Sequence, residues 1–529
     1  MQRRQLFSRL SQVAAALAWQ RVFAPLAQAQ APDAASWTAS AEVFTLGVAS
    51  GEPRPDSVVL WTRLAPQPLQ PDGGVPARAI PVVWEVAVDA QFSQIVRYGV
   101  AVSQPRSAHS VHVDVQGLSP GRSYFYRFRA GGRVSPVGRT RTAPALEDHV
   151  ERLRMAVASC QHYEAGFYAV HREIAASDVD LVLFLGDYIY ETEQPSFIAV
   201  RQHPHEFPDK VAQYTLSDYR VHHASYKLDA DLRASHAAHP WLMVWDDHEV
   251  VNDYAGRESL EPRDQQVFVQ LRAMAYQAYF EHLPVSPSRA PIGASMRMQE
   301  HYQWGSLADI WTVDGRQFRD GHVCYGIHGL LHGQALWRCA AAERPERSML
   351  GAEQEDWLAE GLAGSERIWK LIAQPTQIAP GGISTPLGPV VYADGWDAFP
   401  AARERLMAAI AQPRVPDVIC LGGDVHRHVA ANLRLDPRDL RSPIVASEFV
   451  TSSVSSRGLS EFLSSLVRRS NPDLLHLRGD ERGYILLDLS PQHALCEFRA
   501  TPHPVQRDAK LRTQARYVVE RGVPGPRKV

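Results

Sequence analysis

The sequence predicts a mixed α/β fold preceded by an all-β segment, and three observations lead to this prediction. Short apolar runs end in glycine or in polar side chains, which is typical of buried strands. Helical spacing over residues 166–177 joins two such runs into a βαβ unit. Before Pro144 the runs are short, β-rich and separated by turns. We therefore expect an α/β domain over residues 150–503, after a β-sandwich over residues 43–145.

Residues 1–29 have the pattern of a targeting signal. Arg3 and Arg4 resemble the twin-arginine export motif, and the Ala-rich stretch over residues 13–26 is too polar to span a membrane stably. A small-x-small cleavage pattern ends at Ala29, so we expect the mature chain to begin at Gln30, with a linker over residues 30–42. The prediction is a prokaryotic protein that the twin-arginine machinery exports to the periplasm or the medium, with no transmembrane anchor.

The predicted β-sandwich contains turn-separated runs rich in valine, tryptophan and tyrosine. These runs cover residues 57–61, 81–88, 110–115 and 123–129. Alternation in the last two indicates a sheet with one solvent-exposed face. The segment Gly117-Leu-Ser-Pro-Gly121 looks like the corner of a fibronectin type III or immunoglobulin-like domain. Because no cluster of candidate ligands occurs in this part of the sequence, we assign it to packing or to substrate presentation.

In the α/β segment, five predicted strands end in side chains that bind metals or phosphate. The residues at these strand ends are Cys160; Asp187 and Tyr190; Asp247 and His248; Gln374; and Asp424 and His426. In open α/β sheets, ligands collect beyond the carboxyl ends of the strands. Gly422 and Gly423 are expected to let the backbone approach a ligand closely.

Such a set of side chains is what a dinuclear or larger metal centre requires. Two cations about 3.5–4 Å apart need a carboxylate that bridges them, and Asp187 is the candidate. The pair of cations clamps the attacking and leaving oxygens of a phosphoryl displacement, and a metal lowers the pKa of bound water from about 15.7 to roughly 7. The sequence therefore predicts phosphoester hydrolysis by a metal-bound hydroxide.

Four motifs in this order are similar to those of PhoD-like alkaline phosphatases, a branch of the calcineurin-like metallophosphoesterases. The motifs are Ala158-Ser-Cys160, Gly186-Asp-Tyr-Ile-Tyr190, Trp245-Asp-Asp-His-Glu249 and Gly422-Gly-Asp-Val-His426. Further matches are Asp314-Gly-Arg-Gln-Phe-Arg319, Asp394-Gly-Trp-Asp397 and Ser447-Glu-Phe-Val450. The resemblance covers residues 44–498. It implies a metallophosphoesterase-type αββα core with two packed sheets, behind an immunoglobulin- or fibronectin III-like domain.

The resemblance also implies roles for single residues. Fe(III) would be held by Cys160, Asp187, Tyr190 and His426, and one or two calcium or other divalent ions by Asp247 and Asp424, with Asn252 a further candidate. His248 would bind phosphate or act as the general acid. Thiolate and phenolate suit Fe(III), whereas carboxylate and amide oxygens suit Ca²⁺. The segment Gln374-Pro-Thr-Gln377 departs from the family pattern and leaves the ligand from its strand open.

Several side chains keep two interpretations. Arg316 either binds phosphate as a bidentate donor or forms a structural ion pair. Asp246 is expected to orient its neighbours, since it points away from the direction of Asp247. Among the five cysteines, Cys324 and Cys339 are the candidates for a disulfide in an oxidising compartment.

Composition excludes little beyond nucleic-acid and membrane surfaces. The chain has 529 residues, 21% of them charged, with a net charge of −3. Residues 504–529 are basic and are expected to form a solvated extension, with an anionic polymer as an alternative partner. The family resemblance suggests instead that residues 505–520 form a helix over the metals.

Together these features predict an exported, metal-dependent phosphoester hydrolase that acts on small phosphomonoesters, phosphodiesters or both. A phosphodiesterase or phospholipase acting on anionic polymers or lipid headgroups is one alternative. A non-catalytic, metal-containing binding protein is another. His248 argues against this last alternative, because structural metal sites are closed and have no need of a titratable group beside the ligands.

Overall fold

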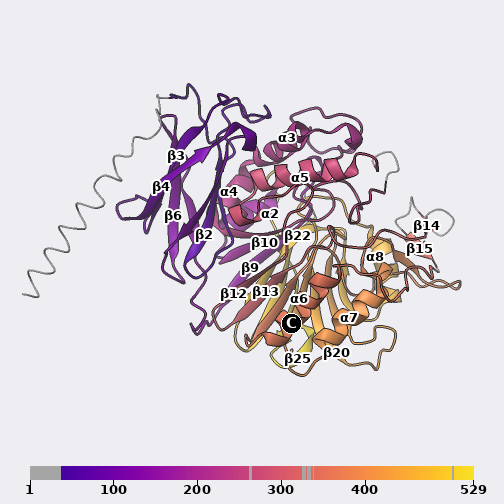
Figure 1. The fold of residues 1–529 in the computed structure, drawn as a ribbon. Helices are drawn as coiled ribbons and strands as arrows, with labels where there is room; N and C mark the ends of the chain where they lie inside the picture. Colours follow the sequence, from indigo (N-terminus) through magenta and orange to yellow (C-terminus); the bar gives the residue numbers. More distant parts are fainter. Residues whose placement is uncertain (1–36, 261–264, 325–328, 331–334, 338, 503–504) are drawn as a thin grey trace, which may run out of the picture. The chain divides into compact units, whose positions relative to one another are not determined.

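The computed structural model describes residues 37–260, 265–324, 329–330, 335–337, 339–502 and 505–529. The predicted export signal lies outside these residues. Residues Met1–Ser40 and Ala41–Val529 form two units, and the second is a mixed α/β structure with four sheets in its described part (Figure 1). No helix of the described ranges is long and apolar enough to cross a membrane.

The largest sheet has ten strands. In chain order they are β1 (Val48–Gly51), β2 (Ser57–Arg63), β5 (Ser110–Gln116), β9 (Leu153–Ala158), β10 (Leu181–Leu185), β11 (Pro240–Val244), β22 (Arg482–Leu489), β23 (His493–Thr501), β24 (Arg512–Glu520) and β25 (Val523–Lys528). Their order in the sheet is β25-β24-β23-β22-β9-β10-β11-β1-β2-β5. The central strands β9, β10 and β11 are parallel, as the βαβ pattern predicts.

A second sheet has seven strands. They are β12 (Glu300–Trp304), β13 (Ala308–Thr312), β16 (Trp369–Ala373), β18 (Val418–Gly422), β19 (His428–Arg434), β20 (Ile444–Val450) and β21 (Leu474–Arg478), in the order β12-β13-β16-β18-β20-β19-β21. The two smaller sheets contain β14 (Gly329–Leu330), β15 (Ala335–Trp337) and β17 (Val390–Tyr392), and β3 (Ile80–Ala87), β4 (Ile95–Ser103), β6 (Ser123–Ala130), β7 (Arg133–Val134) and β8 (Gly138–Arg141).

The helices follow the strands of the two large sheets. They are α2 (Ala169–Ala176), α3 (Leu216–Lys227), α4 (Ala230–Ala238), α5 (Phe268–His282), α6 (Ala352–Gly364), α7 (Pro400–Ile410) and α8 (Glu461–Ser470). In Figure 1, α3 and α5 lie on the other side of the two large sheets from α6 and α7.

The two large sheets pack face to face between these helices. Along β10, Phe184 belongs to the core that includes residues of α2 to α5, whereas Leu183 belongs to a core shared with Leu371 of β16. On β16, Ile372 points the other way and packs with Leu362 of α6. Successive strand residues face opposite sides of a sheet, so each strand feeds two cores. The result is a four-layer helix–sheet–sheet–helix arrangement.

Backbone hydrogen bonds join the N-terminal β-rich segment to the ten-stranded sheet. Strand β1 pairs in parallel with β11, so the ten-stranded sheet continues across the predicted boundary near residue 145. Trp61 of β2 is fully buried, and its indole Nε1 donates to the Glu281 carbonyl of α5 at 3.0 Å. In β6 the predicted alternation occurs, with Tyr124, Tyr126 and Phe128 buried.

The prediction of a solvated C-terminal extension is wrong. Strand β24 pairs with β23, and β25 pairs with β24, at one edge of the ten-stranded sheet. Ala515, Tyr517 and Val519 lie two residues apart along β24 and so face the same side, where they join the core between the two large sheets. The helix suggested for residues 505–520 is also wrong, because β24 occupies most of that range.

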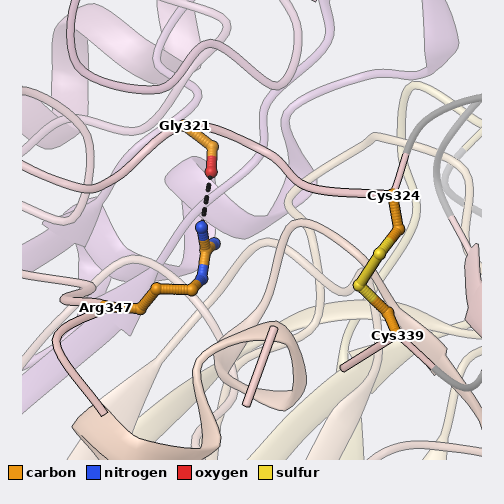
Figure 2. Close-up of a disulfide and its surroundings, with 4 residues drawn as sticks. All are labelled: Gly321, Cys324, Cys339 and Arg347. Carbon is orange, nitrogen blue, oxygen red and sulfur yellow. Dashed lines mark hydrogen bonds between the residues drawn. A yellow bond between two sulfur atoms is a disulfide. The ribbon is translucent and has the colours of Figure 1, made fainter. Parts of the chain in front are cut away.

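Cys324 and Cys339 form a disulfide with a Cα–Cα distance of 6.1 Å. Figure 2 shows the disulfide and, near it, the Arg347 guanidinium donating to the Gly321 carbonyl, a bond of 2.9 Å between Nη1 and the oxygen. The two links tie residues 321–324 to residues 339–347, beside the core that contains α6 and α7.

Replacing Lys227 by methionine is expected to stabilise the protein. The Lys227 ammonium is buried at the end of α3, over the rings of Trp61 and Tyr188, and no salt bridge to it occurs among the described residues. Burial lowers its pKa well below the usual value. The unfolded chain then holds this proton more tightly, so stability rises with pH in the window between the folded and unfolded pKa values.

Lys227→Met should raise stability at neutral pH by roughly 1–4 kcal/mol and remove that part of the pH dependence. The thermal unfolding midpoint at neutral pH and at pH about 10 measures both effects. Lys210→Met, at an exposed position, is the matched control and should change neither. A destabilised Lys227→Met would contradict the expectation.

Candidate metal centre

The ends of β10, β11 and β18 open into one cavity of about 520 Å³. Six of the predicted site residues line it, namely Asp187, Asp247, His248, Asn252, Asp424 and His426. Cys160 and Tyr190 are buried and contact these residues, as the distances below show. The carboxyl ends of the parallel neighbours β10 and β11, and that of β18 in the second large sheet, therefore bring together residues that are far apart in the sequence.

One group of donors combines four different ligand chemistries. Donor atoms of Cys160, Asp187 and His426 lie within 4.8 Å of one another. The Tyr190 hydroxyl donates to Asp187 Oδ2 at 2.7 Å and lies 3.0 Å from His426 Nε2. Ser456 Oγ donates to the same hydroxyl at 2.8 Å. Thiol, carboxylate, phenol and imidazole thus share one small volume.

His426 has the form that a metal ligand needs. Its Nδ1 donates to the Arg457 carbonyl at 2.6 Å, which leaves Nε2 with a lone pair directed at the Tyr190 hydroxyl. Burial lowers the pKa of His426 to about 3, so its ring is neutral. A neutral imidazole oriented through its other nitrogen is typical of metal-ligating histidines.

A second group shares Asp187 with the first. Donor atoms of Asp187, Asp247 and His248 also lie within 4.8 Å of one another. Asp187 Oδ1 is buried and has no hydrogen-bond partner in the structure. Because Asp187 belongs to both groups and keeps one oxygen free, it is placed as a bridging carboxylate would be.

The carboxylates of this cavity carry more negative charge than their surroundings balance. Burial raises the pKa of Asp187 and of Asp424 to about 7, and it raises the pKa of Asp253 well above its usual value. Buried carboxylates stay ionised only when they are paired with cationic groups or coordinate metals. The donor set and the free Asp187 oxygen fit a cation-binding site.

Four of the candidate ligands have an unusual backbone conformation. The φ angles are 59° at Cys160, 56° at Asp187, 60° at Asp424 and 50° at His426. Non-glycine residues adopt this left-handed region at a cost of about 1–3 kcal/mol each, and such residues cluster at functional sites. The positions directly after the strands are therefore fixed by the surrounding structure and not by local preference.

The two glycines of the last motif serve the packing of the chain. A Cβ atom at Gly422 would collide with the Thr376 carbonyl, and one at Gly423 would lie 2.7 Å from Ser159 Oγ. The expectation that these glycines allow a ligand to approach the backbone is thus corrected. They allow the segments that follow the neighbouring strands to pack closely against the backbone. Thr376 Oγ1 in turn donates to Asp424 Oδ2 at 2.5 Å.

His248 is paired with a carboxylate that the sequence analysis did not single out. Its Nδ1 lies 2.7 Å from Glu191 Oε2, and the other Glu191 oxygen accepts from the Asn252 backbone N–H at 2.8 Å. Burial opposes the charged imidazole, but the Glu191 carboxylate raises the pKa of His248 well above its usual value. The ring also stacks on Tyr190, with centroids 4.1 Å apart. Glu191 directly follows the second motif, and this was the available signal.

Arg316 forms a structural ion pair, and its assignment as a catalytic residue is corrected. Its Nε donates to Asp246, its Nη2 lies 3.2 Å from Asp247 Oδ1, and its Nη1 donates to Asp394 Oδ1 at 2.9 Å. All three nitrogens are occupied, and the side chain is buried outside the cavity lining. Arg316 therefore orients Asp246 and Asp247. Of its two interpretations, the structure supports the ion pair.

Gln374 does not reach the cavity. Its amide nitrogen donates to the Thr376 carbonyl, and its Oε1 accepts from the Thr376 N–H and from Trp396 Nε1. In the segment that follows β16, the residue that contacts a candidate ligand is Thr376, whose hydroxyl donates to Asp424. Sequence reasoning gave no signal for it.

Comparisons with known proteins agree with these motifs. The family model described as PhoD-like phosphatase matches residues 155–498, and the model of the PhoD-like phosphatase N-terminal domain matches residues 27–144. Alkaline phosphatase D of Bacillus subtilis (strain 168) is 40% identical over 493 residues, which cover 92% of this chain and 82% of that protein. A solved structure of PhoD aligns with a TM-score of 0.87 at 39% identity, over 93% of both chains.

Proposed function

Because the chain belongs to the PhoD-like phosphatase family and is a phosphoester hydrolase, we propose that its catalytic centre is the metal site built around Asp187. The observation that carries the proposal is the sharing of Asp187 between the two donor groups, with one oxygen left free. The hydrolase is favoured over the binding-protein alternative by the 40% identity to an alkaline phosphatase.

The two donor groups differ in chemistry, which suggests different metals. The proposed Fe(III) ligands are Cys160, Asp187, Tyr190 and His426, and the proposed ligands of one or two calcium ions are Asp187, Asp247, Asn252 and Asp424. Thiolate and phenolate suit Fe(III), whereas carboxylate and amide oxygens favour Ca²⁺. Bound cations would supply a nucleophile at neutral pH and positive charge for the phosphate oxygens.

His248 is proposed as the group that gives a proton to the leaving alkoxide oxygen. Glu191 favours the charged imidazole, which carries a proton on each nitrogen, so we assign Asp187 and Asp247 of the second donor group to the metals and His248 to proton transfer. Glu191 also fixes the ring, so the second nitrogen faces the cavity. Arg316, which is not part of the cavity lining, holds Asp246 and Asp247 in place through its guanidinium. Both monoesters and diesters are compatible with this arrangement.

We further propose a metallophosphoesterase core for the four-layer unit and an immunoglobulin- or fibronectin III-like origin for residues 43–145. Three strands of that segment share the ten-stranded sheet, which supports a packing role. Export by the twin-arginine route is proposed from Arg3 and Arg4. The disulfide between Cys324 and Cys339 supports an oxidising compartment.

The visible absorption spectrum tests the iron assignment. Protein from the native export route is expected to show a phenolate-to-Fe(III) charge-transfer band, and Tyr190→Phe should lose it. The Tyr190 hydroxyl contacts both Asp187 and His426, two further proposed iron ligands, so its removal would remove the phenolate that gives rise to the band. Tyr188→Phe is the matched control, because this neighbouring hydroxyl contacts His236 at 2.8 Å instead, and it should retain the band.

A colourless and active wild type would show that another metal occupies the same residues. Activity that survives complete removal of metals would contradict metal-dependent hydrolysis altogether.

A further inference from the structure

The cavity that contains the candidate metal ligands also has apolar side chains in its lining. They are Ile383, Val390, Val391, Val425, Leu459 and Leu463. Val425 follows β18, and the other five come from the loop before β17, from β17 itself, and from the start of α8 and the residues before it. A site for hydrolysis of small polar phosphates has no need of such a lining, because apolar surface beside water is unfavourable.

The apolar lining continues to the protein surface. Leu459 and Leu463 are 37% and 39% exposed, and Phe462 beside them on α8 is 70% exposed. Two hydrogen bonds hold α8 to the loop: Asn471 Nδ2 donates to the Gly382 carbonyl at 2.7 Å, and the Ser384 N–H donates to Ser470 Oγ at 3.0 Å. The wall is therefore built into the fold, and contiguous exposed apolar surface of this kind marks a binding site.

Two arginine side chains also line this cavity. Arg427 is buried, and its guanidinium donates to Gln377 Oε1 at 2.9 Å, which fixes its position. Arg457 also lines the cavity. Guanidinium groups favour phosphate oxygens, so a phosphate in this cavity has positive charge near it and apolar surface on one side.

We propose that the wall formed by Ile383, Val391, Leu459 and Leu463 is a subsite for a linear alkyl chain attached to the phosphate. The preferred substrates are then amphiphilic phosphodiesters, with the phosphate at the carboxylate-rich end of the cavity. A chain fits better than a compact ring, because the wall runs outward to the exposed part of α8. This inference rests on the proposed function and names a substrate class for the same site.

A chain-length series of alkyl p-nitrophenyl phosphates tests the subsite. Water adds to phosphorus, the bond to p-nitrophenolate breaks, and the alkyl phosphate remains, so methyl, butyl and octyl esters share one leaving group. With each ester below its critical micelle concentration, kcat/KM should rise about fourfold per buried methylene, which corresponds to about 0.8 kcal/mol. The rise should stop where the wall ends.

Variants locate the effect. Leu463→Asn and Val391→Thr are expected to lower the octyl-to-methyl ratio of kcat/KM by about tenfold each, because they remove apolar contact area at similar side-chain size. Leu146→Asn is the matched control: Leu146 is 39% exposed, like Leu463, but lies outside the cavity lining. Its ratio should equal that of the wild type.

Binding measured without turnover separates this inference from the proposed function. Titration calorimetry of the metal-loaded protein should give tighter binding of octylphosphonate than of methylphosphonate, and Leu463→Asn should remove most of the difference. Equal affinities, or equal kcat/KM across the ester series, would overturn the subsite. An octyl preference that appears only above the critical micelle concentration would also overturn it, in favour of binding to an interface. Hydrolysis of none of the esters, with octylphosphonate still preferred, would refute the proposed function and keep the subsite.

Discussion

Replacing Asp187 by asparagine is expected to lower the rate of phosphoester hydrolysis by on the order of 10³-fold and to reduce the bound metal. Asp187 is the residue that both donor groups share, and its Oδ1 has no hydrogen-bond partner among the residues that the structure describes. Asparagine keeps the size of the side chain but lacks the charge, so it cannot bridge two cations as a carboxylate does. Metal content by mass spectrometry and kcat on a phosphodiester measure the two effects.

The same variant should be more stable than the wild type once metals are removed. Burial raises the pKa of Asp187 to about 7 in the folded state, above its value of about 3.9 in the unfolded chain. The metal-free wild type therefore loses stability as the pH rises from about 4 to about 7, and Asp187→Asn lacks this loss. At pH about 8 the difference should be a few kcal/mol in favour of the variant.

Asp309→Asn is the control for the loss of a buried carboxylate. Asp309 is buried, is not part of the cavity lining and contacts His301 and Ser365. It should keep its metal and its rate, and it should lose stability. If Asp187→Asn kept both metal and rate, the bridging role would be refuted.

Much of this site could be predicted from the sequence, because its ligands follow strands that are easy to recognise. The run that ends at Leu185 is apolar throughout and is followed by Gly186, so a buried strand and its end are both marked. Parallel strands share one carboxyl edge, which is why Asp187 after β10 and Asp247 after β11 come together, whereas Asp424 reaches them from the second large sheet. The family resemblance, which rests on four motifs, is confirmed by the comparisons.

The parts that could not be predicted depend on contacts between distant segments. Nothing local to Arg316 distinguishes a phosphate donor from a residue enclosed by Asp246 and Asp394. The pairing of β1 with β11, which joins the β-rich segment to the large sheet, has no local signature. In β24 a signal was present, since Ala515, Tyr517 and Val519 stand at every second position, but the sequence analysis considered only the basic residues of this segment.

Replacing His248 by glutamine is expected to lower kcat by about 10²–10⁴-fold on alkyl phosphoesters and much less on p-nitrophenyl phosphoesters. An alkoxide needs a proton to leave, whereas p-nitrophenolate is a stable anion. His248 is suited to supply that proton, because Glu191 at 2.7 Å favours its charged form. Rates on the two substrates, measured beside the metal content, separate a general acid from a phosphate-binding residue and from a metal ligand.

Glu191→Gln should reproduce the same dependence on the leaving group with a smaller loss, because it removes the charge that favours the protonated ring but keeps a hydrogen-bond partner. His301→Gln is the matched control, since His301 also pairs with a carboxylate, Asp309 at 2.9 Å, but lies outside the cavity lining. It should not change the ratio of the two rates. Equal losses of His248→Gln on both substrates would assign His248 to phosphate binding, and a parallel loss of metal would make it a ligand; either result would refute the general acid.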